Sequence, residues 1–387
     1  MNVSATDWTV TGHPVTAGHP GTAGRTGTAG RTGTAGRTGT AGRTVGQPTA
    51  PQTVAVTGAT GLLGNNLVRM LVNRGFRVRV VVRSAALAAR TLEGLPIDVT
   101  VADLGDGGRL ETVFSGCRAV FHSAAHVHCG WRHLEEMRET NVEGSRRVAR
   151  AARGAGARLV HVSSVDAIGL RHDGTPADED TPIGGMPECP YVVTKRGAEH
   201  AVLAEVDRGL DAVIINPTYM LGPWDWKPSS GRMLLEVGNG WGTLAPPGAN
   251  DFVDVRDVAA GALAAAERGQ TGRRYILGGH PLPYLEAWRV FARVAGRMQP
   301  LGAAPETVVR LAGWFGDAAS LFTRRELPVN SAAATMSMLP HLFSSRRARA
   351  ELGYSSRPFE TTVVDAWQWF VDHGLVRVAR GRPVLAR

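Results

Sequence analysis

The sequence has only three cysteines and no long uninterrupted run of apolar residues. Cys117, Cys129 and Cys189 are too few and too scattered for a framework of disulfide bonds. The richest apolar segment, residues 308–322, contains charged residues, so nothing approaches the roughly 20 apolar residues that cross a bilayer. No apolar export signal stands near the N-terminus. We therefore expect a cytoplasmic protein without a membrane span.

Basic residues exceed acidic ones only modestly, with 43 Lys and Arg against 34 Asp and Glu and a net charge of +9. Most of the basic residues are arginines dispersed among acids, and no nucleic-acid recognition motif accompanies them. This pattern disfavours nucleic acid as a partner. With 43% hydrophobic residues, the 387-residue chain can bury a large core, so we expect a soluble globular protein.

The first 50 residues contain almost no large apolar side chains. The unit Thr-Ala-Gly-Arg-Thr-Gly recurs almost unchanged between Thr22 and Thr44. Such a segment cannot offset the entropy that ordering it costs, so residues 1–50 are predicted to be disordered. Two interpretations remain open, an interaction tail and an upstream start codon assigned over repetitive DNA.

From Pro51 onward, short apolar runs alternate with helix-length stretches. The runs expected to be buried strands are residues 53–56, 77–82, 98–101, 119–122, 158–162 and 211–215. The helix-length stretches are residues 61–74, 133–153 and 191–208. This alternation is typical of an α/β fold with a doubly wound parallel sheet, so residues 51–222 are predicted to form a Rossmann domain. Residues 223–387 are expected to form mainly a smaller substrate-binding domain, with about 251–280 returning to the Rossmann domain.

A glycine-rich turn follows the first predicted strand, where Gly58, Gly61 and Gly64 are spaced Gly-x-x-Gly-x-x-Gly. Glycine permits a tight turn, close approach of the backbone to a pyrophosphate, and close packing of helix on strand. The N-terminus of the following helix attracts phosphate groups. The turn therefore predicts a nicotinamide dinucleotide site. Its predicted cofactor-binding residues are Gly58, Thr60, Gly61, Leu62, Leu63 and Gly64.

The end of the second predicted strand bears on the choice between NADP and NAD. An NAD-specific site normally carries an acidic residue there for the ribose 2′-hydroxyl, whereas this sequence has Arg83. A guanidinium suits the 2′-phosphate of NADP through charge-assisted hydrogen bonds. We expect NADP(H) to be favoured, with NAD(H) as the alternative if Arg83 is only a solvated surface residue. Position alone makes Asp103 a candidate for the adenine edge, and Ala124 and Ala125 candidates for close passage of the cofactor.

Tyr191 and Lys195 stand four residues apart at the start of a predicted helix, so their side chains share one face. A neighbouring ammonium and the positive nicotinamide ring favour the phenolate of a tyrosine, which makes proton transfer feasible near neutral pH. Ser164 ends the fifth predicted strand, at the sheet edge where ligands of doubly wound folds collect, and can orient a substrate oxygen there. Each signal is weak alone. Together they predict a catalytic core of Ser164, Tyr191 and Lys195.

These motifs together resemble the extended short-chain dehydrogenases/reductases, also called the NAD-dependent epimerase/dehydratase family, over roughly residues 52–375. The matching motifs are residues 57–64, 103–104, 121–125, 141–144, 163–164, 191–195, 216–218, 222–223 and 252–258. Within the family, the chain is most similar to the dihydroflavonol reductase-like branch, especially the hopanoid-associated sugar epimerase-like proteins. That likeness is carried by residues 215–218, 273–278 and 343–354.

The resemblance implies roles for individual residues. It makes Ser164 the active-site hydroxyl, Tyr191 the general acid/base and Lys195 its partner, with Asn141 as a helper. Further implied cofactor contacts are Leu104, Tyr191, Lys195, Asn216 and Pro217. Two positions depart from many nucleotide-sugar enzymes: Asn216 stands where they have arginine, and Ile168 where they have tyrosine. Both departures weaken a nucleotide-sugar assignment.

The leading hypothesis is an NAD(P)-dependent oxidoreductase that transfers a hydride between nicotinamide and a carbinol or ketone carbon of a small molecule. The same catalytic core also permits a sugar epimerase or dehydratase that keeps its NAD bound. A third reading, from another class, is a catalytically silent NAD(P)-sensing regulator. The sequence does not identify the substrate, and it leaves a homodimer open.

Two further patterns are interpreted structurally. Several metal-ligating side chains crowd one stretch, but their spacing fits no structural zinc pattern, so we expect no metal site. These side chains are His122, His126, His128, Cys129 and His133. Apolar residues at helical spacing in residues 308–322 predict a packed helix of the smaller domain, with an interfacial membrane helix or a substrate lid as alternatives.

Overall fold

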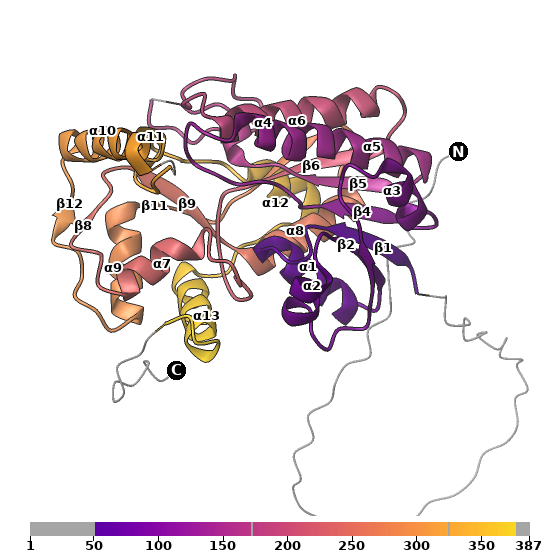
Figure 1. Cartoon of the computed structure of the whole chain (residues 1–387), viewed down its shortest axis with the longest axis horizontal. Helices are drawn as coiled ribbons and strands as arrows, with labels where there is room; N and C mark the ends of the chain where they lie inside the picture. The colour runs from indigo at the N-terminus through magenta and orange to yellow at the C-terminus, as the bar shows by residue number, and fades with distance from the viewer. Residues whose placement is uncertain (1–50, 172, 324–325, 377–387) are drawn as a thin grey trace, which may run out of the picture.

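The computed structural model describes residues 51–171, 173–323 and 326–376, so the predicted disordered tail of residues 1–50 lies outside the described part (Figure 1). Seven parallel strands form the large sheet, in the order β10-β6-β5-β4-β1-β2-β3. The strands are β1 (Thr53–Thr57), β2 (Arg77–Val82), β3 (Ile97–Val101), β4 (Ala119–His122), β5 (Arg158–Val162), β6 (Ala212–Pro217) and β10 (Arg274–Leu277). The chain winds away from β1 in both directions, which confirms the predicted Rossmann class.

Helices cover both faces of this sheet (Figure 1). One face holds α1 (Leu62–Asn73), α8 (Val255–Arg268) and α12 (Arg346–Leu352). The other holds α3 (Gly107–Phe114), α5 (Gly144–Gly154) and α6 (Pro190–Val206). Successive residues of β1 face the two opposite layers of helices. Val54 and Val56 pack with α1 and α8, and Ala55 between them packs in the core on the other face of the sheet. Strands buried on both faces read as continuous apolar runs for this reason.

The helix predicted over residues 133–153 is not one regular α-helix. It consists of α4 (Leu134–Met137), a π-helical segment (Arg138–Glu143) and α5. The π-helical turns contain the buried Asn141. Such irregular turns occur frequently at functional sites, and periodicity in the sequence does not distinguish them from α-helical turns.

The remaining elements form a smaller layer beside the large sheet (Figure 1). A three-stranded sheet has the order β11-β9-β7, and β8 pairs with β12. The strands are β7 (Tyr219–Leu221), β8 (Leu244–Ala245), β9 (Ala249–Asp254), β11 (His280–Pro283) and β12 (Gly302–Ala303). Its helices are α7 (Gly231–Gly238), α9 (Tyr284–Val294), α10 (Glu306–Thr323), α11 (Ser331–Met338) and α13 (Phe359–Asp372). Helix α2 (Ala85–Thr91) follows β2 and packs with α1 against the large sheet. Helices α7, α9 and α13 enclose a core rich in aromatic side chains.

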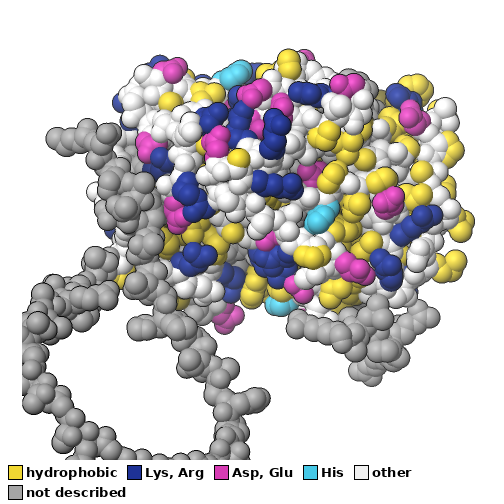
Figure 2. All heavy atoms as spheres, turned by 180° about the vertical axis from the view of Figure 1, so that it is seen from behind, with side chains coloured by type: hydrophobic (Ala, Val, Ile, Leu, Met, Phe, Trp, Pro, Cys, Tyr) yellow, Lys and Arg dark blue, Asp and Glu magenta, His cyan; other side chains and the backbone are white. Residues whose placement is uncertain are grey.

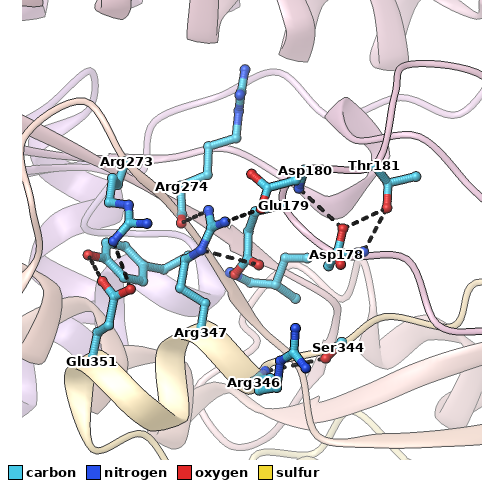
Figure 3. A network of polar contacts seen from close by, with 12 residues as sticks. Asp178, Glu179, Asp180, Thr181, Arg273, Arg274, Ser344, Arg346, Arg347 and Glu351 are labelled. Atoms are coloured by element: carbon cyan, nitrogen blue, oxygen red, sulfur yellow. Dashed lines mark hydrogen bonds and ion pairs between the residues drawn. The ribbon is translucent and has the colours of Figure 1, made fainter.

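Two of the motifs that carried the family resemblance contact each other (Figure 3). Arg273 pairs with Glu351 at 2.8 Å, and the hydroxyl of Tyr275 donates to the same carboxylate at 2.8 Å. The backbone N–H of Gly278 donates to Oγ of Ser345 at 2.8 Å. The C-terminal motif is therefore a strap that fastens α12 and the residues before it to the edge strand β10.

The strap also reaches a loop of the Rossmann domain (Figure 3). Arg347 lies 2.5 Å from Asp180 and 3.8 Å from Glu179. Glu179 in turn accepts the backbone N–H of Ile276 in β10 at 2.9 Å. These contacts hold the first turn of α12 against the loop that contains Glu179 and Asp180, and through Glu179 against β10.

Helix α10 packs through a different face from the one predicted. Its buried residues are small, namely Gly313, Gly316 and Ser320. Its large apolar side chains are exposed: Val308, Leu311, Trp314, Phe315, Leu321 and Phe322. The prediction that the apolar residues pack inward is wrong, because helical spacing identifies an apolar face but not what lies against it.

Hydrophobic side chains also gather over the end of the molecule that holds α10, β8 and β12 (Figures 1 and 2). No helix in the described part of the chain is long and apolar enough to cross a bilayer.

This arrangement of α10 predicts that substitutions at two neighbouring positions differ in their effect on stability. A Cβ added at Gly316 would lie 1.8 Å from the carbonyl oxygen of Val329, so Gly316→Ala should destabilise the protein by about 1–3 kcal/mol. Phe315 is 72% exposed, so Phe315→Gln should change stability by no more than about 0.5 kcal/mol. Urea unfolding of both variants checks this. A large loss with Phe315→Gln would mean that the apolar face is covered.

Candidate active site

The carboxyl ends of β1, β2, β3 and β4 surround a cavity of about 300 Å³. Nine of the predicted cofactor-binding residues line it: Gly58, Thr60, Gly61, Leu62, Arg83, Asp103, Leu104, Ala124 and Ala125. The sequence did not point to Glu139, Thr140, Arg147, Asp225, Lys227 and Ser229, which line it as well. Asp225, Lys227 and Ser229 come from the irregular segment after β7, so the smaller domain contributes one wall.

The three glycines of the turn serve two purposes. Gly58 has a φ of +73°, and an added Cβ would lie 2.5 Å from the backbone nitrogen of Ala124. A Cβ at Gly64 would lie 2.1 Å from the carbonyl oxygen of Gly58. Gly58 and Gly64 are therefore required by the fold itself. At Gly61, by contrast, a Cβ would only meet the Gly58 oxygen at 3.4 Å, so the protein alone leaves room for a side chain there.

The cavity suits a dinucleotide. Gly61 precedes the first turn of α1, whose free backbone N–H groups favour phosphate, and no side chain at Gly61 obstructs their approach. Arg83 is exposed in the wall and makes no ion pair with any described residue. Leu63 and Gly64 do not line the cavity: Leu63 packs in the core beside the sheet, and Gly64 faces Gly58.

Tyr191 and Lys195 lie on one face of α6, near the end of β5. The Lys195 ammonium is 6.0 Å from the centre of the Tyr191 ring and donates to the carbonyl of Val162 at 3.2 Å. Burial lowers the pKa of Lys195 to about 8, although the carboxylates of Glu199 and Asp166 raise it. Burial also raises the pKa of the Tyr191 phenol, the charge of Asp166 adds to this, and a hydrogen bond with Ser164 opposes it. Without further positive charge, Tyr191 is an acid here rather than a base.

Ser164 follows β5 and brings its hydroxyl to Tyr191. Its Oγ donates to Oδ2 of Asp166 at 2.9 Å and accepts the backbone N–H of Asp166 at 3.2 Å. Ser164 thereby caps the short 3₁₀ turn η2 (Val165–Ala167). The predicted trio of Ser164, Tyr191 and Lys195 is thus adjacent in space, with a carboxylate that the sequence interpretation did not include.

Asn141 uses its side chain to join two segments. Its Oδ1 accepts the backbone N–H of His126 at 2.7 Å, and its Nδ2 donates to the His126 carbonyl at 3.0 Å and to Oγ1 of Thr194 at 3.1 Å. Thr194 immediately precedes Lys195 on α6. Asn141 therefore fixes both the loop after β4 and the helix that carries Tyr191 and Lys195.

Asn216 and Pro217 lie at the buried end of β6 and do not line the cavity. Nδ2 of Asn216 donates to the Ser164 carbonyl at 2.9 Å and to Glu199 at 2.7 Å. Glu199 is buried and also pairs with Arg274 at 2.6 Å. Asn216 thus supports the backbone of Ser164 from behind.

The position of Glu199 in the sequence could have identified it as part of the site, although it was not among the predicted residues. It stands four residues after Lys195, on the face of α6 that carries Tyr191 and Lys195. Asp166 stands two residues after Ser164, so the sequence itself places an acidic side chain close to the hydroxyl that is predicted to orient the substrate oxygen. His341 lies near Asp166, yet nothing in its local sequence marks it.

The crowded histidines are engaged in separate contacts. Nε2 of His128 lies 2.6 Å from Glu326, and Nδ1 of His133 lies 3.0 Å from Glu136. His122 is buried between Thr57 and Ser145, and burial lowers its pKa to about 3. Within residues 51–171, 173–323 and 326–376, no group of three His, Cys, Asp or Glu is placed to hold a metal ion.

Comparison with known proteins extends these observations. The model of the NAD dependent epimerase/dehydratase family matches residues 54–278. Sterol demethylase protein B of Methylococcus capsulatus is 34% identical over 328 residues, which cover 84% of this chain and 100% of that protein. A putative dihydroflavonol 4-reductase of Synechocystis is 35% identical over 331 residues, covering 83% and 95%. These findings confirm the resemblance that the motifs predicted.

The likeness extends to solved structures. A nucleoside-diphosphate-sugar epimerase from Pseudomonas aeruginosa is 27% identical with a TM-score of 0.70, and the match covers 84% of this chain and 99% of that one. The similarity therefore continues beyond the large sheet into the smaller domain.

The contrast among the three glycines yields a prediction. Gly61→Ala should leave the melting temperature unchanged but reduce the affinity for a nicotinamide dinucleotide at least tenfold, because the methyl group occupies the path of the pyrophosphate. Gly107→Ala is the matched control, since a Cβ there meets nothing within 4 Å and Gly107 lies outside the cavity. Thermal unfolding and fluorescence titration give both quantities. Unchanged affinity in Gly61→Ala would remove Gly61 from the phosphate site.

Proposed function

We propose that this chain, which belongs to the NAD dependent epimerase/dehydratase family, is a reductase that uses NADPH to convert a ketone into an alcohol. The observation that carries the proposal is the meeting of Ser164, Tyr191 and Lys195 at the carboxyl end of the sheet. The cavity at the same end of the sheet suits the dinucleotide. We also propose that residues 223–387, apart from about 251–280, serve mainly to bind the substrate.

The nicotinamide, when bound, supplies the hydride and its two electrons. Tyr191 donates its phenol proton to the substrate oxygen, a role for which its raised pKa keeps it protonated at neutral pH. The ammonium of Lys195, 6.0 Å from the ring centre, stabilises the phenolate that remains. The hydroxyl of Ser164 braces the substrate oxygen. Positioned proton transfer of this kind contributes about 10²- to 10⁴-fold to the rate.

Two observations favour net reduction over an epimerase that recycles a bound cofactor. The relative from Synechocystis is named a putative dihydroflavonol 4-reductase. Asn216 is buried and holds Ser164 and Glu199, so this position offers no arginine to a nucleotide diphosphate. The third reading, a silent sensor, is disfavoured because the chain retains Ser164, Tyr191 and Lys195 as a connected group.

The choice of NADP rests on Arg83. Its guanidinium is exposed in the wall of the cavity that Asp103 and Leu104 also line, and it forms no ion pair with a carboxylate among the described residues. A 2′-phosphate placed there would gain charge-assisted hydrogen bonds.

Removing the Tyr191 hydroxyl tests the reductase mechanism. Tyr191→Phe should lower kcat at least 100-fold, because the acid is lost, while the affinity for NADPH stays within about twofold. NADPH oxidation with a panel of ring and aliphatic ketones measures the first quantity, and fluorescence titration the second. Turnover that survives in Tyr191→Phe would contradict the mechanism.

Reversing the charge at Arg83 tests the cofactor assignment. Hydrogen bonds to the 2′-phosphate worth about 1.5–3 kcal/mol give a roughly ten- to hundredfold preference for NADP, which Arg83→Asp should reverse. Arg109→Asp is the control, since Arg109 is exposed but does not line the cavity. Both cofactors are titrated into each protein. Equal NADP affinity in wild type and Arg83→Asp would return the assignment to NAD.

A further inference from the structure

A carboxylate and an imidazole lie in a row behind the Ser164 hydroxyl. Oγ of Ser164 donates to Oδ2 of Asp166 at 2.9 Å, and Oδ1 of Asp166 lies 3.7 Å from Nε2 of His341. At the other end, Ser164 hydrogen-bonds to Tyr191. The row runs from the proposed proton donor to a residue of the C-terminal part of the chain. The mechanism above uses neither Asp166 nor His341.

His341 is 3% exposed, and neither of its ring nitrogens forms a hydrogen bond with a described residue. A buried polar group without a partner destabilises the fold, so its retention calls for another explanation. The backbone around it is well held: His341 donates its N–H to the carbonyl of Ala249 at 3.1 Å, and the Leu342 carbonyl accepts from Ala177 at 2.9 Å. These backbone contacts, just before the strap, hold His341 beside Asp166.

Asp166 creates an electrostatic difficulty for ketone reduction. Negative charge develops on the substrate oxygen as the hydride arrives, and a carboxylate beside Ser164 and Tyr191 opposes that charge. Moreover, the Ser164 hydroxyl points to Asp166 and so cannot donate to the substrate at the same time. One proton added to Asp166 and His341 removes both obstacles, because it neutralises the carboxylate and frees the hydroxyl.

Building on the reductase function proposed above, we propose that Asp166 and His341 form a proton-storing pair that positions Ser164 and restores the proton of Tyr191 in each turnover. The substrate oxygen takes the Tyr191 proton, and the phenolate takes the hydroxyl proton of Ser164. Ser164 regains the stored proton from the Asp166 carboxyl, and the carboxylate left behind takes a new proton from a solvent hydronium ion by way of His341. In sum, the ketone gains one hydride and one proton and leaves as the alcohol.

The groups that face Asp166 come from several elements. They are Tyr191 and Lys195 of α6, Cys189 just before it, Cys129 of the loop after β4, and Tyr284 of α9. Burial raises the pKa values of Cys129 and Tyr284 to about 12 and raises those of Cys189 and Tyr191 as well. Below neutral pH these four groups stay uncharged and Lys195 stays charged, so none of these five groups changes its charge there.

The direction of the pH dependence follows from His341. Burial lowers its pKa from 6.5, and the charge of Asp166 raises it part of the way back. The protonated pair is therefore populated as the pH falls below about 6.5. Ketone reduction, which consumes the stored proton, should become faster over that range. Oxidation of the alcohol needs an acceptor for the proton and should become slower.

The test compares His341→Gln, which cannot titrate, with His200→Gln, a control at an exposed position of α6. The pH profile of kcat for ketone reduction is recorded from pH 5 to 9. Wild type and His200→Gln should show the rise at acidic pH. His341→Gln should lose it and turn over about tenfold more slowly at pH 5.5, with KM unchanged, and Asp166→Asn, which is neutral at every pH, should lose the pH dependence. An acidic rise that persists in His341→Gln would overturn the proposal.

A second readout needs no turnover. In the ¹⁵N-labelled protein, NMR titration of the histidine rings should give a pKa for His341 that falls by about one unit in Asp166→Asn, since the imidazolium loses its counter-charge. An unchanged value would disprove the pair. If the wild-type protein reduces no ketone, the proposed reductase function is wrong. The titration still shows in that case whether Asp166 and His341 interact. Should His341→Gln not fold, as judged by its melting temperature, the Asp166→Asn profile and titration carry the test.

Discussion

The close approach of three backbone segments at the carboxyl end of β1 constrains the rest of the site. Gly58 lies against Gly64 of α1 and against Ala124 after β4, at distances that exclude a Cβ at Gly58 or Gly64. This contact brings α1 and the loop after β4 together where the chain winds away from β1 in both directions. The cavity exists because these segments meet there and the next glycine, Gly61, leaves its space open.

Ser164, Tyr191 and Lys195 depend on a second set of contacts, made by amides and carbonyls at neighbouring strand ends. Asn141 ties the loop after β4 to α6, and Asn216 ties Ser164 to Glu199 of the same helix. Lys195 is held by the carbonyl at the end of β5. Because buried polar groups are expensive to leave unpaired, this network defines one position for α6, and with it one geometry for the proton donor.

Local patterns in the sequence were sufficient to predict the Rossmann sheet, the glycine turn, and Tyr191 with Lys195, because each rests on residues a few positions apart. Two kinds of information were out of reach. The partner of an apolar face is a tertiary property, so α10 was assigned the wrong packing face. His341 lies beside Asp166 because the C-terminal part of the chain is fastened to β10, for example by the ion pair between Arg273 and Glu351. No spacing in the sequence indicates that tertiary contact.

A reductase of this kind transfers a hydride to the ketone and consumes one NADPH for each alcohol formed. The most direct measurement uses NADPH deuterated at C4 on the transferred face, with mass spectrometry of the alcohol and spectrophotometry of NADP formation in the same sample. We expect one deuterium on the carbinol carbon for each NADP formed. Isomerised product without NADP formation, or with hydrogen returned from a retained cofactor, would contradict the account and identify an epimerase.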